Sequence, residues 1–502
     1  MQTVPTQEVQ IAAPLGVTSE GVKASLLQRL GAALFEPVDI SFLVFFRIVF
    51  GAILVWEVYR YFTRGWITRY FIEPGINFTY YGFSWVQPWP GRGMYIHFFV
   101  LGIAAACLMV GFLYRFAAPV LFLAFTYFFL LDQTRYLNHF YLVCLISFLM
   151  CFLPAERAFS VDALLRRKIR TDVVPAWTLW LLRVQVGIPY FYGGIAKLNS
   201  DWIHGGEPMR IWLNPFTKVP GFGHIFAADW LVYGFTFGGL LLDLLVVPLL
   251  LWRSTRLFAF GAAVLFNLIN ALIFDIGIFP WLMLGALLIY FPPDLSRRFA
   301  RAFMSPGEEF PNEAPAAAKS EAVVERRTSV PSLSTPQKIV AGLLAAYLFV
   351  QLVVPLRHYV YPGNVSWTEE GHNFAWHMKL RTKGGEGVFN VTHPESGQTW
   401  TIEPQDYLER HQLTKVITKP DLVLLFAHHL AEEKRREGYE NVEVRAQLMV
   451  SLNGRQPQLL IDPNVDLTKE QLSLLPTPWI LPLTTPLEKR GSYQGDQEID
   501  EQ

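Results

Sequence analysis

Long apolar segments are the feature that most constrains the fold of this chain. Hydrophobic residues make up 52% of its 502 residues, and they gather in runs before residue 358 and thin out afterwards. A helix needs roughly 20 consecutive apolar residues to cross about 30 Å of hydrocarbon. The sequence therefore predicts a polytopic α-helical membrane bundle followed by a small α+β extracytoplasmic domain. The formal net charge is zero, which argues against nucleic acid as a partner.

Apolar runs of sufficient length predict about nine membrane spans. They cover residues 38–62, 93–114, 117–133, 136–154, 175–198, 229–252, 256–274, 276–292 and 337–356. An alternative is that 256–274 and 276–292 form one re-entrant unit, which lowers the number of spans.

Basic residues predict the orientation of these spans. They cluster in residues 155–174, again at 253–256 and again at 297–327, and all three connections fall on one side of a nine-span bundle. The positive-inside rule makes that side cytoplasmic, with the N-terminus inside and the tail outside. The predicted organisation is a cytoplasmic N-terminal segment at 1–37, a transmembrane bundle at 38–302, a disordered cytoplasmic linker at 303–336, a last transmembrane helix at 337–357, an extracytoplasmic α+β domain at 358–487 and a mobile tail at 488–502.

The soluble part alternates strand and helix patterns. Residues 388–393 and 399–403 are strand-like and flank a turn, residues 420–437 have helical spacing, and residues 442–452 and 458–461 suggest a hairpin. A second soluble segment, residues 63–92, is rich in aromatic side chains. We expect it to cap the outer face of the bundle.

Lys197 ends an otherwise apolar stretch that follows Arg183. An ammonium group at membrane depth is costly. Desolvation disfavours the charged form, so the sequence predicts an amine that accepts a proton near neutral pH. The alternative is a lysine whose stem lies in lipid while its head reaches the interface.

Asn138 and His139 form a second candidate cluster, at the outer start of the fourth predicted span. Both stand at the same level of the membrane as Lys197, so all three can face one cavity. The alternative is that Asn138 caps the helix and His139 is a hydrogen-bonded structural residue.

Ordered motifs along most of the chain resemble the vitamin K-dependent γ-glutamyl carboxylase family, whose membrane part is the HTTM domain. The motifs lie at residues 46–51, 111–115, 130–134, 138–142, 159–162, 192–202, 270–281, 367–378, 451–453 and 461–466. The ordered set is specific, because chance does not place so many landmarks at similar spacing.

The resemblance implies a reaction and roles for three residues. Lys197 is the base that deprotonates a reduced naphthoquinone, which with O2 gives an epoxide and a base strong enough to remove a glutamate γ-proton. CO2 then adds to the carbanion. His139 stabilises the carbanion or helps to deliver CO2, and Asn138 orients His139 or the quinone.

The resemblance also implies a cofactor, partners and further site residues. The cofactor is reduced vitamin K of the phylloquinol or menaquinol type, with O2 and CO2 as co-substrates and no metal. The partners are the lipid bilayer and a glutamate-containing peptide. Cofactor binding is assigned to Tyr192, Trp376, Met378 and Asn270.

Other readings remain open from the sequence. One is a quinol epoxidase that does not carboxylate protein, and another is a non-enzymatic membrane transporter or scaffold, although no inverted repeat is evident. The three cysteines lie in apolar runs and offer the tail no disulfide. We therefore expect a bacterial inner membrane with a periplasmic tail, and the endoplasmic reticulum as the alternative.

Overall fold

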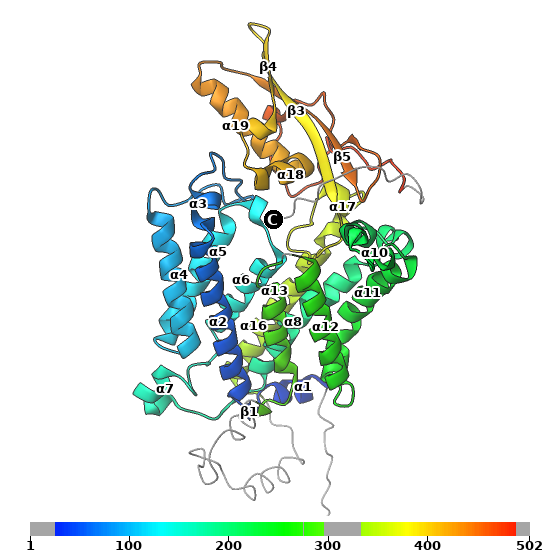
Figure 1. The fold of residues 1–502 in the computed structure, drawn as a ribbon. Coiled ribbons are helices and arrows are strands. Elements are labelled where there is room, and N and C mark those ends of the chain that lie inside the picture. The colour runs from blue at the N-terminus through cyan, green and yellow to red at the C-terminus, as the bar shows by residue number, and fades with distance from the viewer. Residues whose placement is uncertain (1–25, 275, 296–332, 488–502) are drawn as a thin grey trace, which may run out of the picture.

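The computed structural model describes residues 26–274, 276–295 and 333–487. A helical bundle carries a strand-containing C-terminal domain at one of its ends (Figure 1). Most of the predicted linker at 303–336 and all of the predicted tail at 488–502 lie outside the described residues, as do residues 1–25 of the N-terminal segment.

A helix stands at each predicted span position. These helices are α2 (Ser41–Thr63), α4 (Gly93–Val110), α5 (Tyr114–Leu130), α6 (Asn138–Met150), α8 (Trp177–Ala196), α11 (Asp229–Leu251), α12 (Arg256–Ile273), α13 (Phe279–Leu287) and α16 (Thr335–Val353). Within the described ranges, five helical segments are long and apolar enough to cross a membrane, and α5, α6 and the Phe279–Tyr290 stretch are shorter apolar helices. The protein is therefore mostly helical with five candidate spans, and the predicted count of nine is not confirmed.

The shortness of α13 has a local cause. Gly277 adopts a positive φ of 57°, so the backbone turns before the helix begins. Pro280 occupies the first turn of the helix rather than its middle. Proline suits the first helical turn because its missing N–H has no partner there. The predicted span at 276–292 thus begins three residues late.

Short helical turns fill most of the connections. They are α1 (Leu26–Leu34), α3 (Trp66–Phe71), η1 (Gln133–Arg135), α7 (Val161–Leu165), η2 (Arg167–Ile169), η3 (Asp201–Gly205), α9 (Met209–Leu213), η4 (Asn214–Lys218), α10 (Gly223–Phe226), η5 (Leu288–Tyr290), η6 (Val354–Val360) and α17 (Val365–Thr368).

The N-terminal segment and the basic connection at 155–174 lie at the same end of the bundle. Strand β1 (Pro37–Asp39) pairs antiparallel with β2 (Val173–Pro175), and α1 and α7 lie at this end, opposite the C-terminal domain (Figure 1). The structure thus separates the basic end from the strand-rich end, as the charge pattern predicts.

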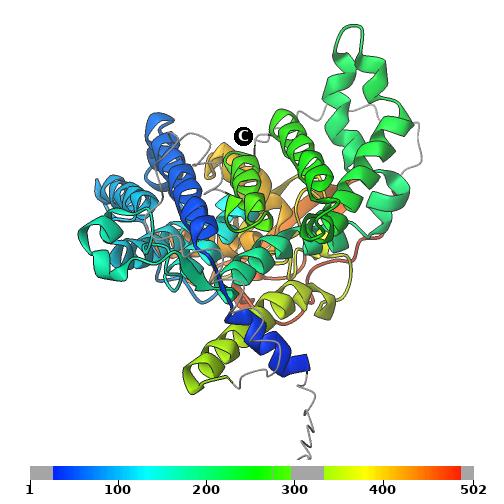
Figure 2. The ribbon, with the colours of Figure 1, turned by 90° about the horizontal axis from the view of Figure 1, so that it is seen from below.

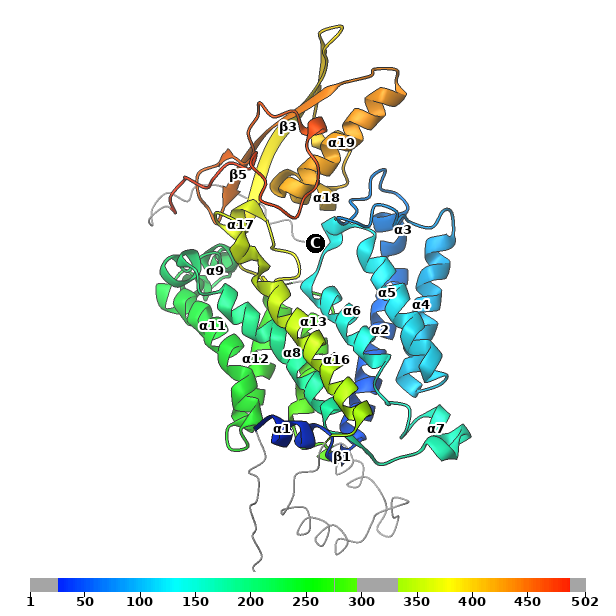
Figure 3. The ribbon, with the colours of Figure 1, turned by 180° about the vertical axis from the view of Figure 1, so that it is seen from behind.

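Helix α16 connects the bundle to the C-terminal domain along one side. It crosses α8 and α6 when the molecule is viewed from behind (Figure 3), and from below it lies at the margin of the bundle near α1 (Figure 2). The Tyr347 hydroxyl donates to Gln185 Oε1 of α8 at 2.6 Å. This bond anchors a helix in which Gln351 is the one residue of Thr335–Val353 classed as buried.

The C-terminal domain contains a four-stranded antiparallel sheet of order β4-β3-β5-β6. The strands are β3 (Lys383–His393), β4 (Gln398–Ile402), β5 (Glu443–Leu452) and β6 (Gln458–Leu459), and the helices are α18 (Arg410–Thr418) and α19 (Pro420–Arg436), with η7 (Pro404–Asp406) and η8 (Leu467–Lys469). The predicted strands and the α19 helix are confirmed, whereas α18 was not predicted because its nine residues are mostly polar.

The aromatic segment 63–92 lies beneath the C-terminal domain and completes its core. Ile76 and Phe78 belong to the same buried cluster as the side chains of α19 and β5. Gln412 of α18 donates to the Ile76 carbonyl at 2.9 Å. The capping role expected for this segment therefore includes a shared hydrophobic core between the two halves of the chain.

Candidate functional site

A cavity of about 1010 Å³ lies between the bundle and the C-terminal domain. Helices α11 and α12 give it a largely apolar wall, with Leu242, Leu265, Phe266, Ile269 and Ile273 among the lining residues. The start of β3 and helix α18 contribute polar and basic side chains. Ligand sites for drug-sized molecules have volumes of about 300–1,000 Å³, so this cavity has room for a large ligand.

Lys197 lies on this cavity and is buried, with 5% of its surface exposed. It follows the last residue of α8, and its Nζ donates to the Gly193 carbonyl at 3.2 Å and to Asp243 Oδ2 at 2.6 Å. The Nζ also lies 5.4 Å from the centre of the Trp202 ring. The alternative reading required the head of Lys197 to reach the membrane interface, but its contacts hold it inside the protein.

Asp243 is a candidate site residue that was not predicted from the sequence. It is a buried carboxylate of α11, 4% exposed, and it is the ion-pair partner of Lys197. An opposite charge this close offsets part of the cost of burying the lysine head group. The signal was present in the sequence, because an acid inside an apolar span is a functional candidate by default.

Close helix packing brings the pair together. A Cβ placed on Gly194 of α8 would lie 2.6 Å from Leu244 Cδ2 and 3.2 Å from the Leu244 backbone nitrogen of α11. Only glycine fits at such a close approach of two backbones. The Gly193-Gly194 pair therefore sets the distance between the helix that carries Lys197 and the helix that carries Asp243.

Asn138 and His139 lie on the same cavity at the start of α6. The Asn138 side chain donates from Nδ2 to the His377 carbonyl at 3.0 Å and accepts from the Tyr136 hydroxyl at 3.0 Å. The N-cap residue of α6 is Leu137, with no side-chain cap, so the alternative in which Asn138 caps the helix is wrong. Its amide is committed to the C-terminal domain instead.

The His139 ring is 8% exposed and packs against Phe140 and Phe279, with ring centres 4.8 Å and 5.8 Å away. Among the described residues, no protein group hydrogen-bonds to this imidazole. A histidine that lines a cavity without a protein partner is available to a ligand, which favours the functional reading over a hydrogen-bonded structural one.

The four predicted cofactor residues divide into two pairs. Met378 and Asn270 line the cavity with Lys197. Tyr192 and Trp376 are not among its lining residues: the Tyr192 hydroxyl donates to the Leu352 carbonyl at 2.6 Å, and Trp376 is 1% exposed, its ring centre 4.9 Å from that of Tyr141.

The segment that carries Met378 is tightly looped. Phe374, Trp376 and Lys379 all have positive φ values, of 67°, 60° and 47°. Such backbone costs free energy for residues other than glycine and persists when its surroundings hold it. The Phe374 backbone N–H donates to the Tyr136 hydroxyl at 2.7 Å, so the residues before α6 hold this loop over the cavity.

Two buried histidines lie behind that loop. His372 Nδ1 and His377 Nδ1 are 3.3 Å apart, and Arg381 Nη1 lies 2.7 Å from His372 Nε2. A guanidinium only donates, so His372 Nε2 accepts and both rings are held neutral. Burial lowers the pKa of His377 to about 3. No group of three or more His, Cys, Asp or Glu side chains in the described ranges is arranged to hold a metal ion.

A basic cluster surrounds Glu369 at the edge of the cavity. Arg381 Nε donates to Glu369 Oε1 at 2.8 Å, and Lys383 Nζ lies 3.3 Å from the same oxygen. Burial alone would raise the pKa of Glu369, but Arg381 and Lys383 lower it to about 2. Burial lowers the pKa of Lys383 to about 8 against the opposing effect of Glu369, and it lowers the pKa of Lys419 to about 7.

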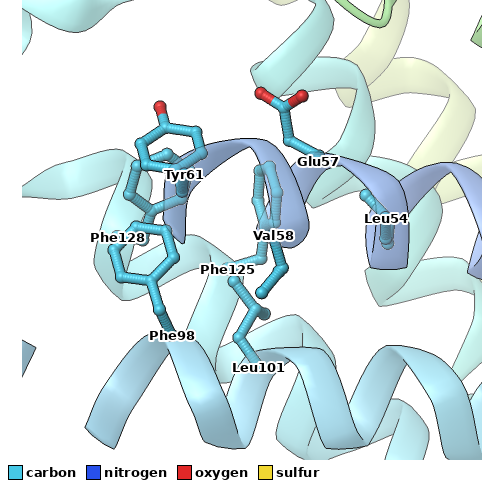
Figure 4. A pocket seen from close by; sticks show the side chains of 8 residues that line it. All are labelled: Leu54, Glu57, Val58, Tyr61, Phe98, Leu101, Phe125 and Phe128. Atoms are coloured by element: carbon cyan, nitrogen blue, oxygen red, sulfur yellow. The ribbon is translucent and has the colours of Figure 1, made fainter. Parts of the chain in front are cut away.

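A second, much smaller void of about 10 Å³ lies beside the cavity among apolar side chains that include Val58, Phe98 and Phe128 (Figure 4). A space of this size holds at most about one water. The Glu57 carboxylate points away from these rings and pairs with Arg60 at 2.7 Å. The small void is a packing gap, and the large cavity is the candidate site.

Two family models match the chain and together cover most of it. The HTTM domain matches residues 35–295, and the lumenal domain of vitamin K-dependent gamma-carboxylase matches residues 336–486. The chain belongs to the vitamin K-dependent γ-carboxylase family. No solved structure matches it. The matches and the apolar helices support an integral membrane protein with a vitamin K-dependent carboxylase-like function, and the family implies reduced vitamin K, O2 and CO2.

Several γ-carboxylase landmarks in this chain are structural. Arg47 is fully buried and donates to the Ala155 carbonyl at 2.6 Å and to the Phe159 carbonyl at 2.5 Å. Asp162 accepts from the backbone N–H groups of Leu113 and Tyr114, at 3.1 Å and 2.9 Å. These bonds satisfy backbone groups at the basic end of the bundle, far from the candidate site.

Asp201 links the Lys197 loop to the C-terminal domain. Its two oxygens accept from Arg455 Nη1 and Nη2, each at 2.6 Å, and Oδ2 also accepts from Asn453 Nδ2 at 2.8 Å. Burial would raise the pKa of Asp201, but these hydrogen bonds lower it. Asp201 therefore fixes the Lys197 loop against the C-terminal domain.

Proposed function

We propose that this protein uses the Lys197–Asp243 pair to deprotonate reduced vitamin K and couples the reaction to carboxylation of glutamate in a peptide. The observation that carries the proposal is that Lys197, Asp243, His139 and Asn138 line one large cavity. They come from three helices that are distant in sequence, and three of the four are buried polar groups in a mostly apolar bundle. Intramembrane charges and buried polar groups mark functional sites.

The chemistry explains why the base acts on the cofactor. A γ-C–H bond of glutamate is far too weakly acidic for a side-chain base near neutral pH, so the protein must draw on a stronger base. Reduced vitamin K, when bound and supplied with O2, provides that base and leaves as the epoxide. The residues of the site then have three tasks, which are to accept one proton, to hold the reactants in place and to exclude water.

Lys197 and Asp243 perform the proton transfer in this proposal. The Nζ accepts a phenolic proton when it is an amine, and the Asp243 carboxylate at 2.6 Å stabilises the ammonium that results. The carboxylate offsets the cost of the buried positive charge, and burial of the pair keeps water from competing for the proton. The Gly193 carbonyl accepts a second hydrogen bond and fixes the direction of the nitrogen.

The remaining lining residues hold the reactants. The apolar faces of α11 and α12 suit a naphthoquinone that arrives from the bilayer, and Met378 and Asn270 lie on the same cavity. The His139 imidazole has no protein partner among the described residues and can donate to a developing negative charge. Asn138 fixes the start of α6 against the lumenal domain through the His377 carbonyl.

The test is vitamin K epoxide formation by purified protein in lipid nanodiscs with reduced vitamin K and O2. We expect Lys197→Ala to abolish the epoxide, and Lys197→Arg to do the same, because a guanidinium keeps the positive charge but does not deprotonate. The matched control is Lys218→Ala, at an exposed lysine that does not line the cavity. Wild-type epoxide yield from Lys197→Ala would refute the assignment of the base.

Carboxylation is read separately in the same reaction. Addition of a glutamate-containing peptide and labelled bicarbonate should give acid-stable labelled peptide, and the label should disappear in Lys197→Ala. Epoxide without label across a set of glutamate peptides would restrict the function to quinol epoxidation.

A further inference from the structure

Strand β3 is longer than the strand that covers one of its sides. All of β3 from Lys383 to Thr392 pairs with β5, but β4 pairs only with Phe389–His393. Residues 383–388 therefore have a neighbouring strand on one side only. In the described ranges, no backbone or side-chain group is bonded to the other side of this stretch, which we call the open edge.

Hydrogen bonds at two points show which groups face the open edge. The Asn453 N–H donates to the Thr382 carbonyl at 2.8 Å, so the polar groups of Thr382 point toward β5. The Leu460 N–H donates to the Leu448 carbonyl at 3.0 Å, so Leu448 points away from β3, and it lies opposite Gly387. Antiparallel strands alternate between these two kinds of pair. Lys383, Gly385 and Gly387 thus present their N–H and C=O groups to the open edge.

The open edge borders the candidate cavity. Lys383, Gly384 and Gly385 are lining residues, and Gly385 and Glu386 are exposed. Three of the six residues at 383–388 are glycines, so few side chains stand between this backbone and an approaching chain. Glycine in a strand marks a place where another backbone can approach closely.

The charge around the open edge is positive. The described residues that line the cavity include nine lysines and arginines and two carboxylates, and both carboxylates are paired with a cation. Two further acids lie nearby: Glu369 pairs with Arg381 and Lys383, and Glu386 belongs to the open edge, so the cations still outnumber the acids. Helix α18 supplies Arg410 and Lys415 next to the open edge, and Lys419 follows directly. A negatively charged chain that approaches this surface meets complementary charge.

We propose that the open edge of β3 binds an extended acidic peptide as an added strand. The inference deepens the proposed function, since this peptide would be the one that carries the glutamate. Peptides that add to a sheet edge gain affinity from backbone hydrogen bonds and specificity from alternate side chains. A segment of about six residues spans the open edge, at about 3.4 Å per residue.

The position of the open edge matches the needs of the reaction. β3 begins five residues after Met378, which lines the cavity together with Lys197. A Cβ on Gly193, the residue whose carbonyl holds Lys197, would lie 3.0 Å from Met378 Cε. A peptide bound along β3 would therefore run toward the catalytic end of the cavity, with every second side chain on the same face.

Backbone N-methylation of the peptide tests this binding mode. The probe is a fluorescent eight-residue peptide of alternating glutamate and threonine, and its affinity for the full-length protein in nanodiscs is measured by anisotropy without reduced vitamin K. Two variants carry N-methyl groups on the odd or on the even residues. We expect at least one variant to bind about tenfold or more weakly, because each lost backbone bond weakens binding and its methyl group blocks the edge. Equal affinity of both variants and the parent peptide would overturn the proposal.

Amide hydrogen exchange locates the contact. The parent peptide should slow exchange in residues 383–388, and the weaker N-methylated variant should not. Lys415→Gln should weaken binding severalfold, whereas the control Lys469→Gln, at a lysine whose side chain is 73% exposed and outside the cavity, should not. Binding without protection of 383–388 would also overturn the proposal. Peptide binding without any epoxide formation would refute the proposed function and leave this inference standing.

Discussion

Replacement of Asp243 by asparagine tests the central electrostatic argument. The Lys197–Asp243 pair is 2.6 Å long, and its side chains are 7% and 5% exposed. Asparagine keeps the shape and one hydrogen-bond acceptor but removes the negative charge. The positive charge that proton transfer creates on Lys197 then has no buried counter-charge.

The expected size follows from the burial of the pair. Loss of one partner of a buried ion pair costs about 3–5 kcal/mol. We take about 3 kcal/mol, because the asparagine oxygen still accepts a hydrogen bond. At about 1.36 kcal/mol per tenfold change in rate, epoxide formation should slow by about 100-fold, because the ammonium formed by proton transfer is no longer paired.

The assay is the initial rate of epoxide formation in nanodiscs at one pH, for wild type and Asp243→Asn. The matched control is Glu156→Gln, which also neutralises a buried carboxylate in an ion pair, with Arg115 at 2.9 Å, but at the opposite end of the bundle. The control should keep the wild-type rate. A wild-type rate in Asp243→Asn would show that the carboxylate does not support proton transfer to Lys197.

Three further predictions concern packing and charge. Gly194→Ala should lower the unfolding temperature and the epoxide yield, because its methyl group would lie 2.6 Å from a leucine of α11, whereas Gly261→Ala, with nothing within 4 Å, should do neither. The pKa of Glu369 is held near 2 in the folded protein, below the ordinary 4.5, so the stability that this carboxylate contributes is present above pH 4.5 and is lost as the pH falls toward 2. Glu369→Gln should therefore lower the free energy of unfolding by about 3 kcal/mol at pH 7. The difference from wild type should vanish near pH 2, in thermal unfolding followed by tryptophan fluorescence. Acidic-peptide affinity should fall as the pH rises from 6 to 8, because burial lowers the pKa of Lys419 to about 7 and this lysine then loses its positive charge. Lys419→Gln should flatten most of this dependence in the anisotropy assay.

Apolar runs and strand alternation were enough to predict most of the architecture. The helices α2, α11 and α12 coincide with predicted spans because their apolar runs are long and unbroken. The strand at 443–452 was predicted because its side chains alternate in the pattern of a half-buried strand. The shorter α13 departs from its predicted span because Pro280 dictates where the helix begins.

Candidate site residues that stand out in the sequence by themselves could be predicted, whereas a residue that matters through its contact with a distant helix could not. Lys197, His139 and Asn138 meet on one cavity as expected. Tyr192 was chosen for its place in a motif, but it lies five positions before Lys197, and this offset places it about 140° away around a helix. Tyr190, two turns before Lys197, does line the cavity. Asp243 lies 46 residues from Lys197 on another helix, so only the packing of α8 against α11 pairs them.

The shared core beneath the C-terminal domain makes the folding of that domain depend on a segment of the helical bundle. Ile76 and Phe78 complete a cluster whose other members are almost all made after the last membrane helix. The C-terminal domain expressed alone would lack Ile76 and Phe78 in its core and would expose the open edge of β3 to solvent. An exposed strand edge promotes aggregation. The C-terminal domain is thus expected to require the helical bundle for correct assembly, and recombinant production should keep both in one chain.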